Sequence, residues 1–142
     1  MLVIPQFNPR LQGWQVSFFI SECQPLCLGG NTSFAYGIND MGQVVGDSPP
    51  TNNAASHAFI YSNGEIHDLG TLGGGLSGAQ DINNIGQIVG YSRILLSSTV
   101  EHAFLYTNGA MQDLGALGNR TTTIARGIND LGQVVGESYS AT

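Results

Sequence analysis

The sequence predicts an all-β fold made of repeated, antiparallel four-stranded units. A ten-residue segment occurs three times, each unit carries two hairpin signals, and no stretch keeps the 3.6-residue period of a helix over a useful length. Twenty glycines without a collagen period indicate many tight turns. Short strands joined by turns are therefore expected along most of the chain.

The repeat sets the boundaries of the expected units. Its three copies read GINDMGQVVG (37–46), DINNIGQIVG (81–90) and GINDLGQVVG (127–136). Equivalent residues are 44 to 46 positions apart along the chain. We expect a diverged N-terminal segment with one strand (1–23) and a repeat region (24–142), with units at about 35–78 and 79–124 and a partial unit at 125–142.

The first hairpin signal of each unit is Asn-Asp-x-Gly or Asn-Asn-x-Gly between apolar residues. This pattern fits a type I turn followed by glycine in the left-handed conformation, with the first Asn side chain bonding to the backbone two residues later. The six turn positions also carry side-chain oxygens, and a Ca2+ site is the alternative interpretation. These positions are Asn39, Asp40, Asn83, Asn84, Asn129 and Asp130.

The second hairpin signal, Asn-Gly in YSNGEI and YTNGAM, predicts a type I′ turn and so fixes the strand register. In that register Tyr61 opposes Ile66 and Phe59 opposes Asp68. His57 and Asp68 become diagonal neighbours on one sheet face, and His102 and Asp113 become the same pair one unit later.

Such a His–Asp pair resembles a general base, but its occurrence in both full units favours a structural hydrogen bond. Ser33, Ser77 and Thr121–Thr123 are expected to join a buried polar network near the crossings between units. We predict no catalytic residue and no metal ligand among these side chains.

Four short strands in about 45 residues correspond to one blade of a β-propeller. The chain would hold about 2.5–3 blades, whereas a closed ring has about four to eight. The sequence therefore predicts either a homo-oligomer whose chains complete one another or a longer chain with further repeats.

Composition excludes several classes of partner. Charged residues make up 10% of the chain, lysine is absent, and four arginines face ten carboxylates. A net charge of −6 argues against binding to nucleic acid, and no apolar run is long enough for membrane insertion. Cys23 and Cys27 lack further metal-ligand spacing and are expected to be small hydrophobic residues or free thiols; the alternative is a bridge across the three intervening residues, which would be strained in a strand.

The residues HAFIY, NG, IHDLGTLGG and GQ-x-VG, recurring in register, resemble the HAF-type extracellular repeat. The resemblance covers about residues 24–142. It implies a propeller-like protein of the bacterial cell surface or exterior, without a general catalytic assignment. No signal-peptide core is evident in this chain.

A function-bearing cluster is expected among residues that do not repeat, and we expect these to be scattered through loops and turns. They are Asp47, Glu65, His67, Arg93, Glu101, Arg120, Arg126 and Glu137. Arg120 and Arg126 with Tyr139 form one candidate polar rim. We predict a non-enzymatic structural or ligand-binding module, with surface carbohydrate or protein as ligand. The alternative is part of a secreted hydrolase or lyase whose catalytic residues lie elsewhere.

Overall fold

The computed structural model describes residues 3–8, 13–18, 27–51, 54–118 and 121–140. These residues form β-strands, turns and loops without a helix, so the predicted all-β class is confirmed. The strands are β1 (Val3–Asn8), β2 (Gly13–Phe18), β3 (Phe34–Ile38), β4 (Val44–Ser48), β5 (His57–Ser62), β6 (Glu65–Gly70), β7 (Ser77–Ile82), β8 (Ile88–Arg93), β9 (Glu101–Thr107), β10 (Ala110–Asp113), β11 (Thr122–Ile128) and β12 (Val134–Tyr139). No helix in this part of the chain is long and apolar enough to cross a membrane.

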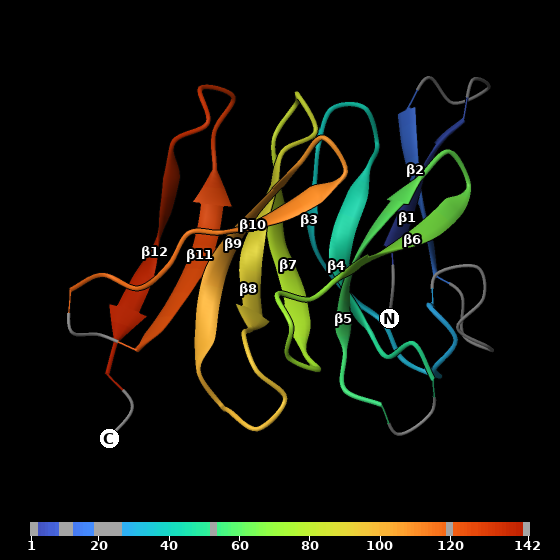
Figure 1. The fold of residues 1–142 in the computed structure, drawn as a ribbon. Helices are drawn as coiled ribbons and strands as arrows, with labels where there is room; N and C mark the ends of the chain where they lie inside the picture. Colours follow the sequence, from blue (N-terminus) through green and yellow to red (C-terminus); the bar gives the residue numbers. More distant parts are fainter. Residues whose placement is uncertain (1–2, 9–12, 19–26, 52–53, 119–120, 141–142) are drawn as a thin grey trace.

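The strands form antiparallel sheets in chain order (Figure 1). Strands β1 and β2 make an N-terminal hairpin, where the sequence predicts one strand. We name the next three groups sheet 1 (β3-β4-β5-β6), sheet 2 (β7-β8-β9-β10) and sheet 3 (β11-β12). Sheets 1 and 2 therefore have the four strands predicted for a unit, and sheet 3 has the predicted first hairpin.

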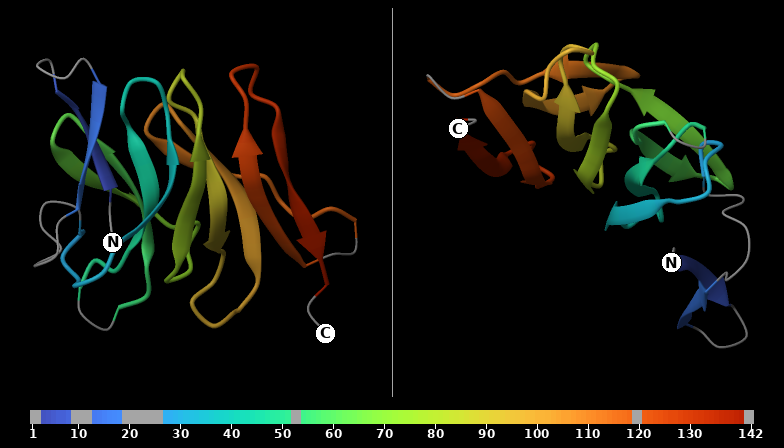
Figure 2. Two further views of the ribbon diagram at one scale, coloured as in Figure 1. Left: turned by 180° about the vertical axis from the view of Figure 1, so that it is seen from behind. Right: turned by 90° about the horizontal axis from the view of Figure 1, so that it is seen from below.

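Successive sheets pack face to face through the first strand of the later sheet. Strand β7 packs against β3, β4 and β5, and β11 packs against β7, β8 and β9. Seen from below, sheets 1, 2 and 3 follow one another along an arc, and the N-terminal hairpin stands apart beyond β3 (Figure 2). The described strands do not close into a ring of sheets.

The core consists of two layers, one at each junction between sheets. Between sheets 1 and 2 it includes Val45, Ile82, Ile88 and Phe104. Between sheets 2 and 3 lies a smaller cluster of Val89, Ala103, Ala125 and Ile128. Because both faces of sheet 2 are buried, each of its strands β8 and β9 carries apolar residues on both sides.

The Asn-Gly turns have the predicted conformation. Asn63 and Gly64 have φ values of 54° and 89°, and Asn108 and Gly109 have 53° and 78°. Positive φ at both central residues defines the type I′ turn. The register follows from it: Phe59 pairs with Asp68 and Tyr61 with Ile66.

The first strand of each first hairpin contains a β-bulge that the sequence pattern did not predict. The register shifts between Ala79 and Asp81 in β7, and at the equivalent places in β3 and β11. A glycine that occurs in all three copies of the repeat faces the bulge from the next strand. A Cβ on this residue in sheet 2, Gly90, would lie 2.0 Å from the Gly78 carbonyl oxygen. The bulge leaves one residue per hairpin unpaired, and these residues are Tyr36, Gln80 and Arg126.

One expectation about the cysteines is wrong. Cys27 is disulfide-bonded and is not a free thiol. The expectation rests on the strain of such a bond within a strand, but Cys27 lies in a loop before β3, where that strain does not apply. Cys23 lies outside the described residues.

Candidate functional site

The first Asn of each repeated turn stabilises its own hairpin. Asn83 Oδ1 accepts hydrogen bonds from the backbone N–H groups of Ile85 (3.2 Å) and Gln87 (2.8 Å). Asn83 Nδ2 donates to Gln87 Oε1 at 2.8 Å. Asn39 and Asn129 make the same three bonds in their hairpins. Together with Gly86 at a φ of 82°, this confirms the predicted turn.

The same turns also bind to one another across the sheets. Asn39 Nδ2 donates to the Asn83 carbonyl at 3.1 Å, and Asn83 Nδ2 donates to the Asn129 carbonyl at 3.0 Å. The next residues form a parallel row, in which Asp40 N–H donates to Asn84 Oδ1 and Asn84 N–H donates to Asp130 Oδ1. We call these two rows of hydrogen bonds the turn ladder.

The acidic side chains of the turn ladder face an amide. Asn84 Nδ2 donates to Asp40 Oδ2 at 2.9 Å and to Asp130 Oδ2 at 3.1 Å. Both carboxylates are therefore engaged by the Asn side chain between them. The described residues contain no group of three His, Cys, Asp or Glu side chains suited to a metal ion. The geometry explains all six turn positions as a hydrogen-bonded framework.

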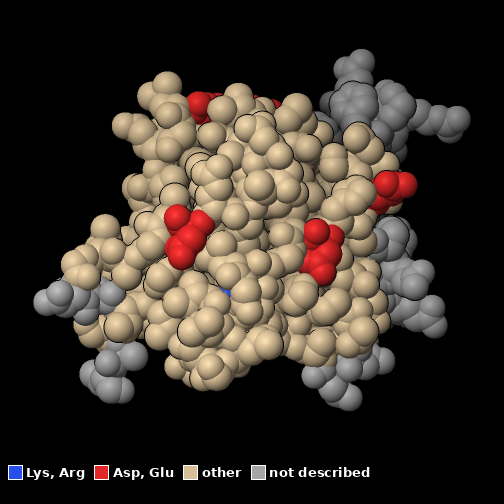
Figure 3. All heavy atoms as spheres, viewed as in Figure 1, with Lys and Arg blue, Asp and Glu red and all other residues tan. Residues whose placement is uncertain are grey.

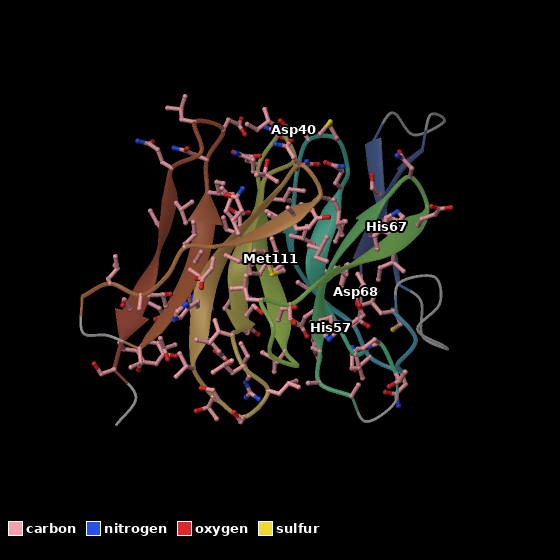
Figure 4. The ribbon with its side chains drawn as sticks, in the orientation of Figure 1. Asp40, His57, His67, Asp68 and Met111 are labelled. Atoms are coloured by element: carbon pink, nitrogen blue, oxygen red, sulfur yellow. The ribbon has the colours of Figure 1, made fainter. Side chains whose placement is uncertain are left out.

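The two predicted His–Asp pairs have one geometry. His57 Nδ1 lies 2.8 Å from Asp68 Oδ2, and His102 Nδ1 lies 2.9 Å from Asp113 Oδ2. The other carboxylate oxygen of each Asp accepts a backbone N–H two residues later. Figure 4 shows His57 beside Asp68, with Asp40 at the opposite end of the sheet and His67 on the outer hairpin. Each pair thus anchors the end of its own outer strand.

A structural role for these pairs predicts equal effects of their removal. His57→Ala and His102→Ala should each lower the free energy of unfolding by about 1 kcal/mol or less, because the carboxylates are partly exposed. Urea denaturation measures this loss. His67→Ala is the control, since His67 is exposed and lies 3.7 Å from Glu65. An effect of only one of the two paired histidines, on ligand binding rather than on stability, would contradict the structural role.

Hydroxyl groups join neighbouring sheets at the crossings. Ser77 Oγ accepts the Ala58 N–H (2.8 Å) and donates to the Gly70 carbonyl (2.6 Å). Thr123 Oγ1 makes the equivalent bonds to Ala103 and Gly115 at 2.9 and 2.7 Å. The expected buried polar network is therefore present at these two residues. Ser33, at the equivalent place just before β3, has a buried Oγ without a hydrogen-bond partner among the described residues.

The non-repeating residues were expected to be scattered through loops and turns, but most of the described ones lie in strands. Asp47, Arg93, Glu101, Arg126 and Glu137 all lie in strands. Arg93 Nε lies 3.8 Å from Glu101 Oε1, and Glu65 and His67 form a separate pair on β6. Arg126 pairs with Glu137, and the candidate rim of Arg120, Arg126 and Tyr139 stays a prediction. Arg120 lies outside the described residues.

The bulges bring together six residues from two repeat positions whose residue type differs between the sheets. We call this row of residues the polar strip. It consists of the bulge residues Tyr36, Gln80 and Arg126 and of Asp47, Tyr91 and Glu137 on the adjacent strands. Tyr36 hydrogen-bonds to Asp47, and Arg126 Nε donates to Glu137 at 3.1 Å. Arg126 Nη1 donates to Gln80 Oε1 at 3.0 Å, which links sheets 3 and 2.

Tyr91 occupies the middle of the polar strip. Its ring lies over Gly78, where a Cβ would come within 2.8 Å of the ring. Asp47 and Arg126, on the two neighbouring sheets, both act on its hydroxyl electrostatically. Tyr91 thus connects the acidic end of the strip in sheet 1 to the Arg–Glu pair in sheet 3.

Burial shapes the acidity of the polar strip. It raises the pKa of Asp47, against hydrogen bonds from Ser56 and Tyr36 that favour the carboxylate. Burial and the Asp47 charge raise the pKa of Tyr36 to about 12. Burial raises the pKa of Tyr91 too, helped by Asp47 and Glu101 and opposed by Arg126. Both hydroxyls therefore remain protonated hydrogen-bond donors at neutral pH.

The raised pKa of Asp47 predicts a pH-dependent effect of Asp47→Asn. Ionised Asp47 is destabilising in the fold, so its contribution is favourable below the ordinary Asp pKa and is lost as pH rises through the folded pKa. Relative to wild type, the variant should be more stable at about pH 7 than at about pH 3. Ser56→Ala removes a hydrogen bond that favours the Asp47 carboxylate, so this variant should lose more stability than wild type between these two pH values. Urea denaturation at both pH values measures these differences, and an equal Asp47→Asn effect at both would contradict the account.

The polar strip was not predicted, although the sequence holds a signal for it. Equivalent positions read Tyr, Gln and Arg at 36, 80 and 126, and Asp, Tyr and Glu at 47, 91 and 137. Each second position directly follows an unchanged glycine. Changing chemistry beside a constant residue marks a site whose side chains are not fixed by packing.

Comparisons with protein-family models, with curated proteins and with solved structures found no match to this chain.

Proposed function

We propose that the chain is a non-enzymatic ligand-binding module of a propeller-like, HAF-type surface or secreted protein. Its ligand surface is the polar strip, and its ligand is a neutral oligosaccharide. The carrying observation is that the residues of the polar strip differ from sheet to sheet, whereas the turn ladder and the crossing hydroxyls repeat. The strip has Tyr36 and Asp47 in sheet 1, Gln80 and Tyr91 in sheet 2, and Arg126 and Glu137 in sheet 3.

The side chains of the polar strip suit a polyhydroxylated ligand. Tyr36 is half exposed and offers an aromatic face with a polar edge, the combination that binds amphipathic partners. Glu137 and Gln80 supply acceptors, and Arg126 supplies donors in a fixed plane. Each hydroxyl of a sugar can both donate and accept, so this mixed row can satisfy several hydroxyls in succession.

The charge of the molecule favours a neutral ligand. Ten carboxylates against four arginines disfavour an anionic one. In Figure 3 the visible face is mostly uncharged, with acidic side chains set apart from one another. The Arg126–Glu137 pair also leaves no unpaired cation within the polar strip.

The arrangement of the sheets supports the propeller-like part of the proposal. Sheets 1 and 2 have four antiparallel strands in sequential order, as a propeller blade has. The sheets also follow an arc in Figure 2. The resemblance to HAF-type repeats supports the surface or extracellular location.

Calorimetric titration with a panel of neutral oligosaccharides tests the proposal. For a sugar that binds, Tyr36→Ala should weaken affinity by about tenfold or more, equivalent to about 1.4 kcal/mol. Tyr61→Ala is the matched control, because Tyr61 lies in the same sheet but outside the polar strip. Arg126→Gln should also weaken binding.

Two outcomes would overturn this function. One is that no sugar in the panel binds, or that Tyr36→Ala binds as wild type does. The other is that mass spectrometry finds shortened sugars after incubation, which would favour the hydrolase or lyase alternative.

A further inference from the structure

The two ends of the row of sheets expose the two halves of one interface. Sheet 1 meets sheet 2, and sheet 2 meets sheet 3, through equivalent residues. The outer face of sheet 3 and the β3 face of sheet 1 show these same residues without a covering sheet. Self-association does not depend on the ligand proposed above.

Apolar residues identify the uncovered halves. Val89, on the face of sheet 2 covered by sheet 3, is 0% exposed, whereas its equivalent Val135 in sheet 3 is 67% exposed. On the opposite half, Ile82 is 4% exposed, whereas its equivalent Ile38 in β3 is 52% exposed. The N-terminal hairpin lies beyond β3 in Figure 2 and still leaves Ile38 half exposed. Each end thus shows apolar surface that the chain buries wherever a sheet follows.

The turn ladder ends with matching donors and acceptors. In the described residues, Asn129 Nδ2 bonds only to Gln133, although in the other turns this group also reaches the next sheet. The Asp130 N–H likewise lacks the next side-chain oxygen that Asp40 and Asn84 have. At the other end, the Asn39 carbonyl accepts the Gly42 N–H of its own turn, and no described residue of a preceding turn donates to it or to Asp40 Oδ1. Sheet 3 thus ends the turn ladder with donors, and sheet 1 ends it with acceptors.

We propose that copies of this chain associate head to tail, with sheet 3 of one copy covering β3 of the next. The occupant of each end is a second copy, because each copy carries both halves of an interface that already occurs twice within it. In this register, Asn129 donates to the Asn39 carbonyl of the second copy, and Val135 packs beside its Ile38. Such a heterologous interface forms either a ring or an open row of copies.

Light scattering coupled to size-exclusion chromatography measures the association. The wild-type chain should have the mass of two or more copies at about 100 µM and fall toward one copy on dilution. Val135→Glu should reduce the mass to that of one copy. Leu131→Glu is the matched control: Leu131 is 84% exposed, and its equivalent Ile85 stays 67% exposed within the chain, so this position lies outside the interface.

Mixing two blocked variants tests the head-to-tail direction. Ile38→Glu and Val135→Glu should each be a single copy alone, and circular dichroism should show that both keep the wild-type sheet content. Mixed, they should form a one-to-one pair, because one retains the sheet 3 face and the other retains the β3 face. A single-copy wild-type chain at about 100 µM would overturn the proposal and leave the ends to further repeats or another protein. An unchanged mass of Val135→Glu, or no pairing on mixing, would overturn it too.

Discussion

Phe104→Ala should lower the free energy of unfolding by about 3–5 kcal/mol, the range for truncating a buried phenylalanine. Phe104 in β9 is completely buried in the layer between sheets 1 and 2. The truncation removes an aromatic ring and leaves a cavity that strands from two sheets would have to close. Because the layer joins the sheets, the loss measures packing between units as well as within one.

Urea denaturation monitored by far-ultraviolet circular dichroism measures this loss. Leu96→Ala is the control, since Leu96 is mostly exposed in the loop after β8 and should change stability by about 0.5 kcal/mol or less. A Phe104→Ala loss near that of Leu96→Ala would mean that the layer between sheets 1 and 2 is not a packed core.

Asn83→Ala should lower stability by about 2–3 kcal/mol, because two backbone N–H groups in part-buried hydrogen bonds lose their acceptor and the bond to the next sheet is lost. Asn83 is buried, and it joins the turn ladder to both neighbours: it accepts from Asn39 through its carbonyl and donates to the Asn129 carbonyl through Nδ2. The variant also removes the bond to Gln87 Oε1.

Asn129→Ala separates the turn from the turn ladder. Asn129 makes the same bonds within its hairpin but is exposed and donates to no further sheet in the described residues. Its loss should therefore be about 1 kcal/mol. Equal losses for the two variants would show that bonds between sheets add nothing to the bonds within the turn.

The local structure could be predicted from the sequence because it depends on nearby residues. Asn63 and Gly64 adopt the positive φ values that a type I′ turn needs, and this turn alone fixes Tyr61 opposite Ile66. The His57–Asp68 contact follows from that register. The periodicity likewise predicted the four-stranded order of sheets 1 and 2.

Contacts between sheets could not be predicted in this way. The spacing of Asn39 and Asn83 shows that they are equivalent, but it does not show that one side chain reaches the carbonyl of the other. The polar strip depends on bulges at Tyr36 and Gln80, which turn residues out of the paired register. The alternation of apolar and polar residues along a strand predicts neither the position of a bulge nor which side chains the bulge brings into contact.

Equivalent positions of the three sheets are of two kinds. Where residues repeat, as at Asn39 and Asn83, hydrogen bonds join one sheet to the next. Where residues change, as at Asp47 and Tyr91, side chains gather on the polar strip and hold no repeated framework bond. We therefore expect substitutions at the first kind of position to alter stability, and those at the second kind to alter ligand binding, with Asp47→Asn also changing stability because this carboxyl is buried.

The most direct test of ligand binding at the polar strip is an NMR titration of the isotope-labelled chain with the tightest-binding neutral oligosaccharide. The account predicts that the largest amide shift changes occur at Tyr36, Asp47, Tyr91 and Arg126, which span three sheets. Changes concentrated instead at the turn ladder or around His57 and His102, with the polar strip unaffected, would contradict it.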